Sequence, residues 1–411
     1  MKIIYLVHQF FPMHYTGTEK VIFNISSMMQ KAGHNVKVLT YSFYEDTFYD
    51  KTIGSLLLRD IFYKGIPITA IKHKYAPKDL NISVENDDMK QIAEDLIIKE
   101  KPDIIHSGHL MRIADMIESV RLANIPYVIT LTDFWLICPK VILVNSQNNL
   151  CPGPEKGSIC NESCKDIDNK YIISRLRKAE SILNNAKMVI APSAFLASIF
   201  QNEFPDLNIK VISHGLNYKK LIKNNKVYKK GEKITFCYAG SLNPHKGVHI
   251  ILNAFKKIKN DNIYLDIYGS GDNEYEKYLK NISNGDKRIK FRGVFTDNQI
   301  GEVFNKIDIL IVPSLWYETY SLVLHEALAC GIPVFASNVG VMKEKIKHNI
   351  NGLTFTIGDE DSLKRIMQET VSNPEIINEW KANVGRIYIP SIEQEAYEYE
   401  ILYKNIILNS L

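Results

Sequence analysis

Residues 308–337, DILIVPSLWYETYSLVLHEALACGIPVFAS, contain the pattern that decides the fold. The apolar run Ile309–Val312 is typical of a buried strand, and a helix is predicted to begin near Tyr320 or Ser321. A second apolar run, Pro333–Ser337, predicts the next strand. A strand, a helix and another strand in this order indicate a parallel sheet, because parallel neighbours need a long crossover connection.

The same alternation covers the rest of the chain. In the first half, apolar runs predict strands at Ile3–Val7, Val36–Thr40, Ile104–His106, Tyr127–Thr132, Met188–Ala191 and Lys210–Ser213. In the second half, they predict strands at Ile234–Ala239, Tyr264–Tyr268, Ile289–Arg292, Ile309–Val312 and Pro333–Ser337. The predicted fold class is therefore α/β, with parallel sheets that carry helices on both faces.

The length predicts two domains, since 411 residues exceed the roughly 250 to 300 at which single cores stop growing. The alternation breaks near residues 215–232, so we expect Rossmann-like domains at 1–215 and 216–390. Residues 391–411 predict a helix that returns to the first domain. Ligands of such sheets bind beyond the carboxyl ends of the strands, so we expect the site in a cleft between the domains.

Composition and charge exclude several classes of protein. The chain is 45% hydrophobic and 23% charged, as in soluble globular proteins, and its net charge of +4 is too mild to imply nucleic acid. The N-terminal MKIIYLVHQFFP lacks a small-residue cleavage site, so it is interpreted as a buried strand rather than a signal peptide. Seven lysines between Lys219 and Lys233 indicate either a solvated linker or a membrane-surface patch.

The first helix has a marked start and end in the sequence. Thr16 and Glu19 match the T-x-x-E capping box, in which each side chain bonds a backbone N–H of the first turn. Gly33 lies where a C-terminal cap belongs. The sequence therefore predicts a helix directly after the first strand.

Two glycine-containing loops follow predicted strands of the second half. In CYAGSLNPHKG, residues 237–247, Gly240 ends a strand and Lys246 precedes a helix, which is either a phosphate-binding arrangement or an ordinary loop with a surface lysine. In IYGSGDNEY, Gly269 and Gly271 either let a ligand approach the backbone or form a simple turn.

The opening stretch supplies the third loop. Glu318 is expected just before the helix and Glu326 about two turns into it, so the N–H groups of Thr319–Leu322 lie between two carboxylates. Helix N-termini bind phosphate, and ionised carboxylates accept hydrogen bonds from sugar hydroxyls. This arrangement fits a sugar nucleotide, although the spacing alone also fits two surface glutamates.

Together these segments resemble the retaining glycosyltransferases of family 4. The resemblance rests on HQFFPMHYTGTEK, KAGHNVKVLT, PDIIHSGHL, VITLTDFWLICP, VISHGL, AGSLNPHKG, IYGSG, the stretch 308–337 and NGLTF. It implies the GT-B fold of two facing Rossmann-like domains with an interdomain cleft, and a C-terminal helix that packs back on the N-terminal domain. It also implies that the first domain binds the acceptor and the second the nucleotide-sugar donor.

The resemblance implies a role for each matching position. Lys246 would bind the donor diphosphate, Glu326 the ribose and Glu318 the donor sugar, with Gly17 in a loop that faces donor and acceptor. The expected catalytic residues are His109, Glu318 and Lys246, with His106 as the alternative histidine, and Asp133 lies on the acceptor side. The donor-binding residues implied are Gly17, Gly240, Ser241, Lys246, Gly269, Glu318, Thr319, Tyr320, Ser321, Leu322 and Glu326.

The resemblance further implies the reaction and its setting. A sugar would move with retention from a nucleotide diphosphate, UDP or GDP, to a hydroxyl of a glycan, lipid-linked or small-molecule acceptor in cell-surface polysaccharide or glycolipid biosynthesis. Because no D-x-D motif follows an early strand, we expect no catalytic metal and no cofactor. The family's usual donor-loop arginine is Ser241 here. We expect a cytoplasmic enzyme, either free or at the inner face of the membrane.

Four cysteines fall within the loop 138–168. Without an export signal a disulfide framework is not expected. Cys138, Cys151, Cys160 and Cys164 either hold a structural zinc ion that braces the loop or remain reduced thiols, and only Cys160 and Cys164 have a standard short ligand spacing.

Other functions were weighed against the transferase. A dinucleotide oxidoreductase should carry G-x-G-x-x-G after its first strand, and HQFFPMHYTGTEK does not. A sugar-nucleotide epimerase of the same fold would consume donor without an acceptor. A non-enzymatic protein that binds metal or nucleic acid through its cysteines and lysines is the remaining alternative.

Overall fold

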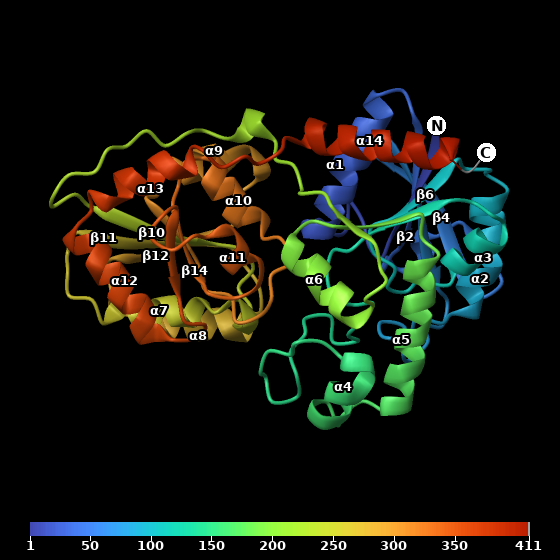
Figure 1. Ribbon diagram of the computed structural model, residues 1–411, viewed down its shortest axis with the longest axis horizontal. Helices are drawn as coiled ribbons and strands as arrows, with labels where there is room; N and C mark the ends of the chain where they lie inside the picture. The colour runs from blue at the N-terminus through green and yellow to red at the C-terminus, as the bar shows by residue number, and fades with distance from the viewer. Residues whose placement is uncertain (410–411) are drawn as a thin grey trace. The chain divides into compact units, whose positions relative to one another are not determined.

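The computed structural model describes residues 1–409. The chain divides into two compact units, one formed by Met1–Gly215 with the segment from Ile392 onward and the other by Leu216–Ser391. Each unit contains its own sheet flanked by helices (Figure 1). Residues 410 and 411 of the helix predicted at 391–411 lie outside the described residues.

The first unit has a nine-stranded sheet in the order β3-β4-β5-β2-β1-β6-β7-β8-β9. Its strands are β1 (Lys2–Val7), β2 (Asn35–Tyr41), β3 (Lys51–Ile53), β4 (Leu56–Tyr63), β5 (Ile66–His73), β6 (Ile104–Ser107), β7 (Tyr127–Thr130), β8 (Met188–Ala191) and β9 (Ile209–Val211). Its α-helices are α1 (Gly17–Lys31), α2 (Asp87–Ala93), α3 (Met116–Leu122), α4 (Ser158–Ser163), α5 (Asn169–Asn184), α6 (Ala194–Glu203) and α14 (Ile392–Leu408).

The sheet of this unit is mainly parallel, as predicted, but it carries an antiparallel edge that the sequence did not reveal. β3 pairs with β4, and β4 with β5, in antiparallel fashion. Lys64 and Gly65 connect β4 to β5 with φ of 48° and 84°, as in the tight turns that join antiparallel strands. A two-residue connection can join only antiparallel neighbours, so this edge of the sheet cannot be parallel.

The prediction of a capping box at the start of α1 is wrong, because the box is not formed. Thr16 is the N-cap residue, but its side chain accepts no backbone hydrogen bond. Its hydroxyl instead donates to Glu19 Oε2 at 2.6 Å. Glu19 is fully buried, and its Oε2 is bonded to the Thr16 side chain instead of the N-cap backbone N–H.

The return of the C-terminal helix to the first unit is confirmed. α14 packs along α1, and the two helices lie side by side (Figure 1). Tyr399 and Tyr403 of α14 are fully buried in the core that includes β1 and α1. The hydroxyl of Tyr403 lies 2.5 Å from His106 Nδ1, which ties the end of the chain to β6.

The second unit has a six-stranded sheet in the order β12-β11-β10-β13-β14-β15, and every pair is parallel, as predicted. Its strands are β10 (Ile234–Ala239), β11 (Ile263–Tyr268), β12 (Ile289–Gly293), β13 (Ile309–Val312), β14 (Val334–Ser337) and β15 (Gly352–Phe355). Its α-helices are α7 (Val248–Lys256), α8 (Asn273–Ser283), α9 (Ile300–Phe304), α10 (Leu322–Ala329), α11 (Gly340–Lys345), α12 (Glu360–Ser372) and α13 (Ile376–Val384).

Candidate active site

Three loops of the second unit follow the carboxyl ends of neighbouring parallel strands. β11, β10 and β13 are adjacent in the sheet. The loops after them begin at Gly269, Gly240 and Pro313. Because the carboxyl ends of parallel strands meet at one edge, the three loops predicted to bind a donor share that edge.

Glu318 is the centre of the polar contacts in these loops. Its Oε1 accepts hydrogen bonds from Lys246 Nζ at 2.7 Å, from Ser314 Oγ at 2.8 Å and from Trp316 Nε1 at 3.0 Å. Burial by itself raises the pKa of Glu318, but the charge of Lys246 and these hydrogen bonds outweigh it, so the pKa lies below its ordinary value. Among the described residues, its bonds all end on Oε1, which leaves Oε2 for a further donor.

Lys246 is held by an aromatic residue that the sequence analysis missed. Its Nζ lies 4.8 Å from the centre of the Trp316 ring, a cation–π contact. The ring of His245 packs edge-on against the same indole, and Leu315 N donates to His245 O at 2.8 Å. Trp316 therefore joins the first loop to the third. The only signal in the sequence is an aromatic residue two positions before the expected carboxylate.

Gly269 of the second loop is required because its backbone packs directly on the backbone of the first loop. Gly269 has a φ of 135°, and a Cβ there would lie 1.8 Å from Gly240 O. The two loops are also joined by a hydrogen bond from Leu242 N to Ser270 O at 2.9 Å. Gly240 and Ser241 are exposed at the same edge. Close contact between the loops thus requires glycine at 269 without any ligand.

The helix of the opening stretch begins at Leu322, close to the expected position. Ser321, its N-cap residue, has the left-handed φ of 62°, which is unusual for a residue with a side chain. Tyr320 is buried and its ring stacks on His325 at 3.9 Å, whereas Thr319 is half-buried. Glu326 lies half-buried within α10. The first turn of α10 therefore follows Glu318 closely in the chain, and within it the N–H groups of Leu324 and His325 donate to Ser321 O.

In the first unit, His109 and Asp133 are brought together. His109 Nε2 lies 2.6 Å from Asp133 Oδ2, and Met111 N donates to His109 Nδ1 at 3.1 Å. Since Nδ1 accepts a hydrogen bond, Nε2 carries the proton and donates it to Asp133. Both residues line a small cavity at the ends of β6 and β7, together with Trp135.

The choice between the two predicted histidines follows from their contacts. His106 is fully buried in β6, and its two ring nitrogens lie within hydrogen-bonding distance of Tyr403 Oη and Thr130 Oγ1. Burial lowers the pKa of His106 to about 3. His106 is thus a core residue, and His109 is the histidine that lines the cavity.

The sequence analysis also missed a buried pair beside His109. His8 follows β1, and its ring lies 4.0 Å from that of His109. His8 Nε2 is 3.7 Å from Glu19 Oε1, and within residues 1–409 neither this oxygen nor His8 Nδ1 has a hydrogen-bond partner. Burial, followed by the charges around it, lowers the pKa of His8 well below its usual value. Gly17 is exposed nearby, and a Cβ there would meet no atom within 4 Å.

The four cysteines of the loop 138–168 are unbonded thiols. Burial, together with the other three sulfurs, raises the pKa of Cys160 to about 12, and burial also raises the pKa of Cys138 and Cys151. Within residues 1–409, no group of three or more His, Cys, Asp or Glu side chains is placed to hold a metal ion. The structural zinc ion expected as one alternative therefore has no support in the structure.

Comparison with solved structures establishes the fold. Anabaena HepE in complex with UDP aligns with a TM-score of 0.71 and 18% identity over 98% of this chain and 100% of that chain. Sucrose-phosphate synthase from Thermosynechococcus elongatus aligns with a TM-score of 0.71 and 17% identity over the whole of both chains. The fold is therefore that of the GT-B glycosyltransferases.

Sequence comparison then identifies the family. The profile described as Glycosyltransferase Family 4 matches residues 15–220, and that described as Glycosyl transferases group 1 matches residues 219–386. The chain belongs to glycosyltransferase family 4.

Curated relatives match over part of the chain. An uncharacterized glycosyltransferase of Methanocaldococcus jannaschii is 27% identical over 47% of this chain and 53% of its own length. The lipopolysaccharide 1,2-N-acetylglucosaminetransferase of Salmonella typhimurium is 29% identical over 41% of this chain and 48% of its own length. The chain thus spans about half the length of these relatives. Among the described residues, no helix is both long and apolar enough to cross a membrane.

Proposed function

We propose that the protein is a glycosyltransferase that moves a sugar from a nucleotide-diphosphate donor to a hydroxyl of a glycan or lipid-linked acceptor, in cell-surface glycan biosynthesis. The observation that carries this proposal is the buried Lys246–Glu318 pair next to the first turn of α10, at the carboxyl edge of a parallel sheet. A cation, a helix N-terminus and an ionised carboxylate match the three parts of such a donor.

The proposed donor site has a separate group for each part. An ammonium has three N–H donors, and Glu318 takes one, so Lys246 can still donate to a diphosphate. The first turn of α10 adds backbone N–H groups for the same anion. Glu318 Oε2 would accept a sugar hydroxyl, and Glu326, one to two turns along α10, a ribose hydroxyl.

The proposed reaction follows from where charge develops. As the bond from the sugar to the diphosphate breaks, negative charge builds on the leaving oxygen, where Lys246 and the α10 N-terminus would stabilise it. The acceptor hydroxyl would attack the face from which the diphosphate leaves and pass its proton to the departing diphosphate oxygen, with retention of configuration and without a metal ion. Transfer would be carried out by groups of the chain alone.

The acceptor side is proposed at the His109–Asp133 pair in the first unit. Asp133 orients the His109 ring by accepting its Nε2 proton, and the pair lines a cavity. UDP is the nucleotide that we propose, because a solved structure of the same fold is a complex with UDP. We further propose a cytoplasmic location at the inner face of the membrane, where lipid-linked acceptors are found.

Thermal unfolding with UDP-sugars tests the donor site, since a bound ligand raises the melting temperature by mass action. We expect stabilisation by a UDP-sugar, and its loss in Glu326→Gln, which keeps the size of the side chain but removes its charge. Glu369→Gln, an exposed glutamate on α12, is the matched control and should behave like the parent. Equal stabilisation of Glu326→Gln and the parent would contradict the role of Glu326.

Transfer assays test the reaction itself. His109→Gln is expected to lower the rate of transfer by about 100-fold or more while donor stabilisation persists, because the histidine is proposed on the acceptor side. Consumption of the donor without any acceptor, giving an epimerised nucleotide sugar, would instead support an epimerase. No stabilisation by any nucleotide sugar would refute the proposed class of function.

A further inference from the structure

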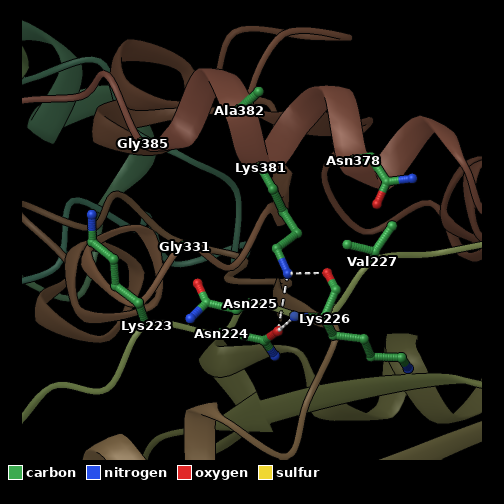
Figure 2. Close-up of a pocket in the computed structure, with 10 residues that line it drawn as sticks. All are labelled: Lys223, Asn224, Asn225, Lys226, Val227, Gly331, Asn378, Lys381, Ala382 and Gly385. Atoms are coloured by element: carbon green, nitrogen blue, oxygen red, sulfur yellow. Dashed lines mark hydrogen bonds between the residues drawn. The ribbon is translucent and has the colours of Figure 1, made fainter.

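A second site candidate lies at the opposite edge of the same sheet. A pocket of about 440 Å³ is lined by the segment before β10, by α13 and by Gly331 (Figure 2). Asn224, which lines it, donates its N–H to Cys330 O at 2.8 Å and its side-chain amide to Ile307 O at 2.9 Å. Both carbonyls precede strands, β14 and β13, so the pocket lies at their amino ends. The donor loops follow the carboxyl ends, and the two sites are therefore separate.

The lining of this pocket is cationic. Of its ten residues three are lysines and three are asparagines, and none is acidic. Lys226 Nζ pairs with Asp308 at 3.0 Å, whereas Lys223 is exposed at the rim. Figure 2 shows Lys223 and Lys381 on opposite sides of Asn225, with the Lys381 ammonium directed at Asn224 and Lys226 and the Lys223 ammonium directed away from it. The pocket therefore combines two cations with an amide that can donate hydrogen bonds.

Lys381 is the half-buried cation of the pocket. Its Nζ donates to Asn224 Oδ1 at 2.9 Å and to Lys226 O at 2.6 Å, both uncharged acceptors. In the part of the chain that the structure describes, it has no carboxylate within 4 Å. Burial lowers its pKa to about 8, with Asp308 opposing and Lys226 adding to the shift. A desolvated ammonium without a counter-ion is costly, and an anion in the pocket would offset that cost.

We propose that this pocket binds a small organic phosphate through Lys381 and Lys223. Lysine binds phosphate oxygens as a compact charge, and the volume lies within the range of small-molecule sites. Val227 and Ala382 add apolar surface for the organic part of the ligand. The phosphate belongs either to a soluble metabolite or to a lipid headgroup. Val227 is 67% exposed, and Tyr388, three positions after the lining residue Gly385, is 72% exposed.

Calorimetric titration of the full chain with glycerol phosphate tests the soluble source. We expect saturable binding that weakens at least about tenfold in Lys381→Met, which keeps the length of the side chain but removes its charge. Lys259→Met, an exposed lysine of the same unit, is the matched control and should bind like the parent.

Flotation with vesicles tests the lipid source. If the ligand is a lipid headgroup, vesicles of phosphatidylcholine with phosphatidylglycerol should bind the parent but not Lys381→Met. Vesicles of phosphatidylcholine alone should bind neither protein. Because Lys381 bonds two neighbours, the charge reversal Lys223→Glu, at an exposed position, is a second variant that leaves these contacts intact. Absence of saturable binding to both probes, or binding by folded Lys381→Met and Lys223→Glu equal to that of the parent, would overturn the proposal.

Discussion

Replacing Lys246 by methionine should destabilise the second unit as well as weaken donor binding. The substitution leaves the buried Glu318 carboxylate with two neutral donors and no counter-ion. Breaking a buried ion pair from one side costs about 3 to 5 kcal/mol. The two side chains are 20% and 12% exposed, so we expect the low end, about 3 kcal/mol.

A double-mutant cycle in urea unfolding measures this effect. Lys246→Met with Glu318→Gln removes both charges, so the double variant should be more stable than Lys246→Met alone, with a coupling of about 2 kcal/mol. An unfolding free energy of Lys246→Met within about 1 kcal/mol of the parent would refute the reasoning. The reasoning would also be refuted if the double variant lost as much unfolding free energy as the two single variants together.

The same pair sets a dependence on pH. Since the pKa of Glu318 in the folded protein lies below its ordinary value of 4.5, the pair contributes stability above that value. That contribution is lost as the pH falls through the folded pKa. In Lys246→Met the charge of the lysine is gone, so burial dominates and raises the pKa of Glu318. Acidification then protonates Glu318 and removes the free-energy cost of its buried, unpaired charge. The difference in stability between the parent and the variant should therefore shrink below pH 4.5, and a constant difference would contradict the assignment.

Two backbone predictions concern the same loops. Ser321→Gly should raise the free energy of unfolding by roughly 0.5 to 1 kcal/mol. The reason is that glycine relieves the left-handed strain at this position by more than it adds freedom to the unfolded chain. A melting temperature below that of the parent would contradict this prediction. Gly269→Ala should lower the free energy of unfolding by about 2 kcal/mol or more, since a Cβ would collide with Gly240 O. Gly285→Ala, with a φ of 81° and no atom within 4 Å of the Cβ, should lose clearly less in the same melt, and equal losses would exclude the collision.

Much of the fold could be predicted because apolar runs mark buried parallel strands. Every strand expected in the second half of the chain appears in the sheet of the second unit, close to its predicted bounds. The antiparallel edge at β3–β5 was missed because β3 is short and exposed, β4 is only partly buried, and β4 pairs with β5 through a short turn. The apolar stripe of α14 predicted a buried helix, and the buried Tyr399 and Tyr403 confirm its place on the first unit.

The candidate site could be predicted only in part. The family resemblance pointed to Lys246 and Glu318 in the second unit and to His109 and Asp133 in the first, and within each unit the structure brings the two side chains together. Their partners were not visible, since the contact of Lys246 with Glu318 spans 72 positions along the chain. For the same reason the buried His8 was missed.

The sequence by itself determined the α/β class, the repeated strand–helix unit and the family, because these depend on local periodicity and on motifs within single loops. Only the tertiary structure decided which charges meet. Glu318 is a buried carboxylate held by Lys246, Trp316 and Ser314, His106 is a core residue, and the cysteines form no metal site among the described residues. Burial and contacts between distant loops set these outcomes, and neither is encoded in the spacing of residues along the chain.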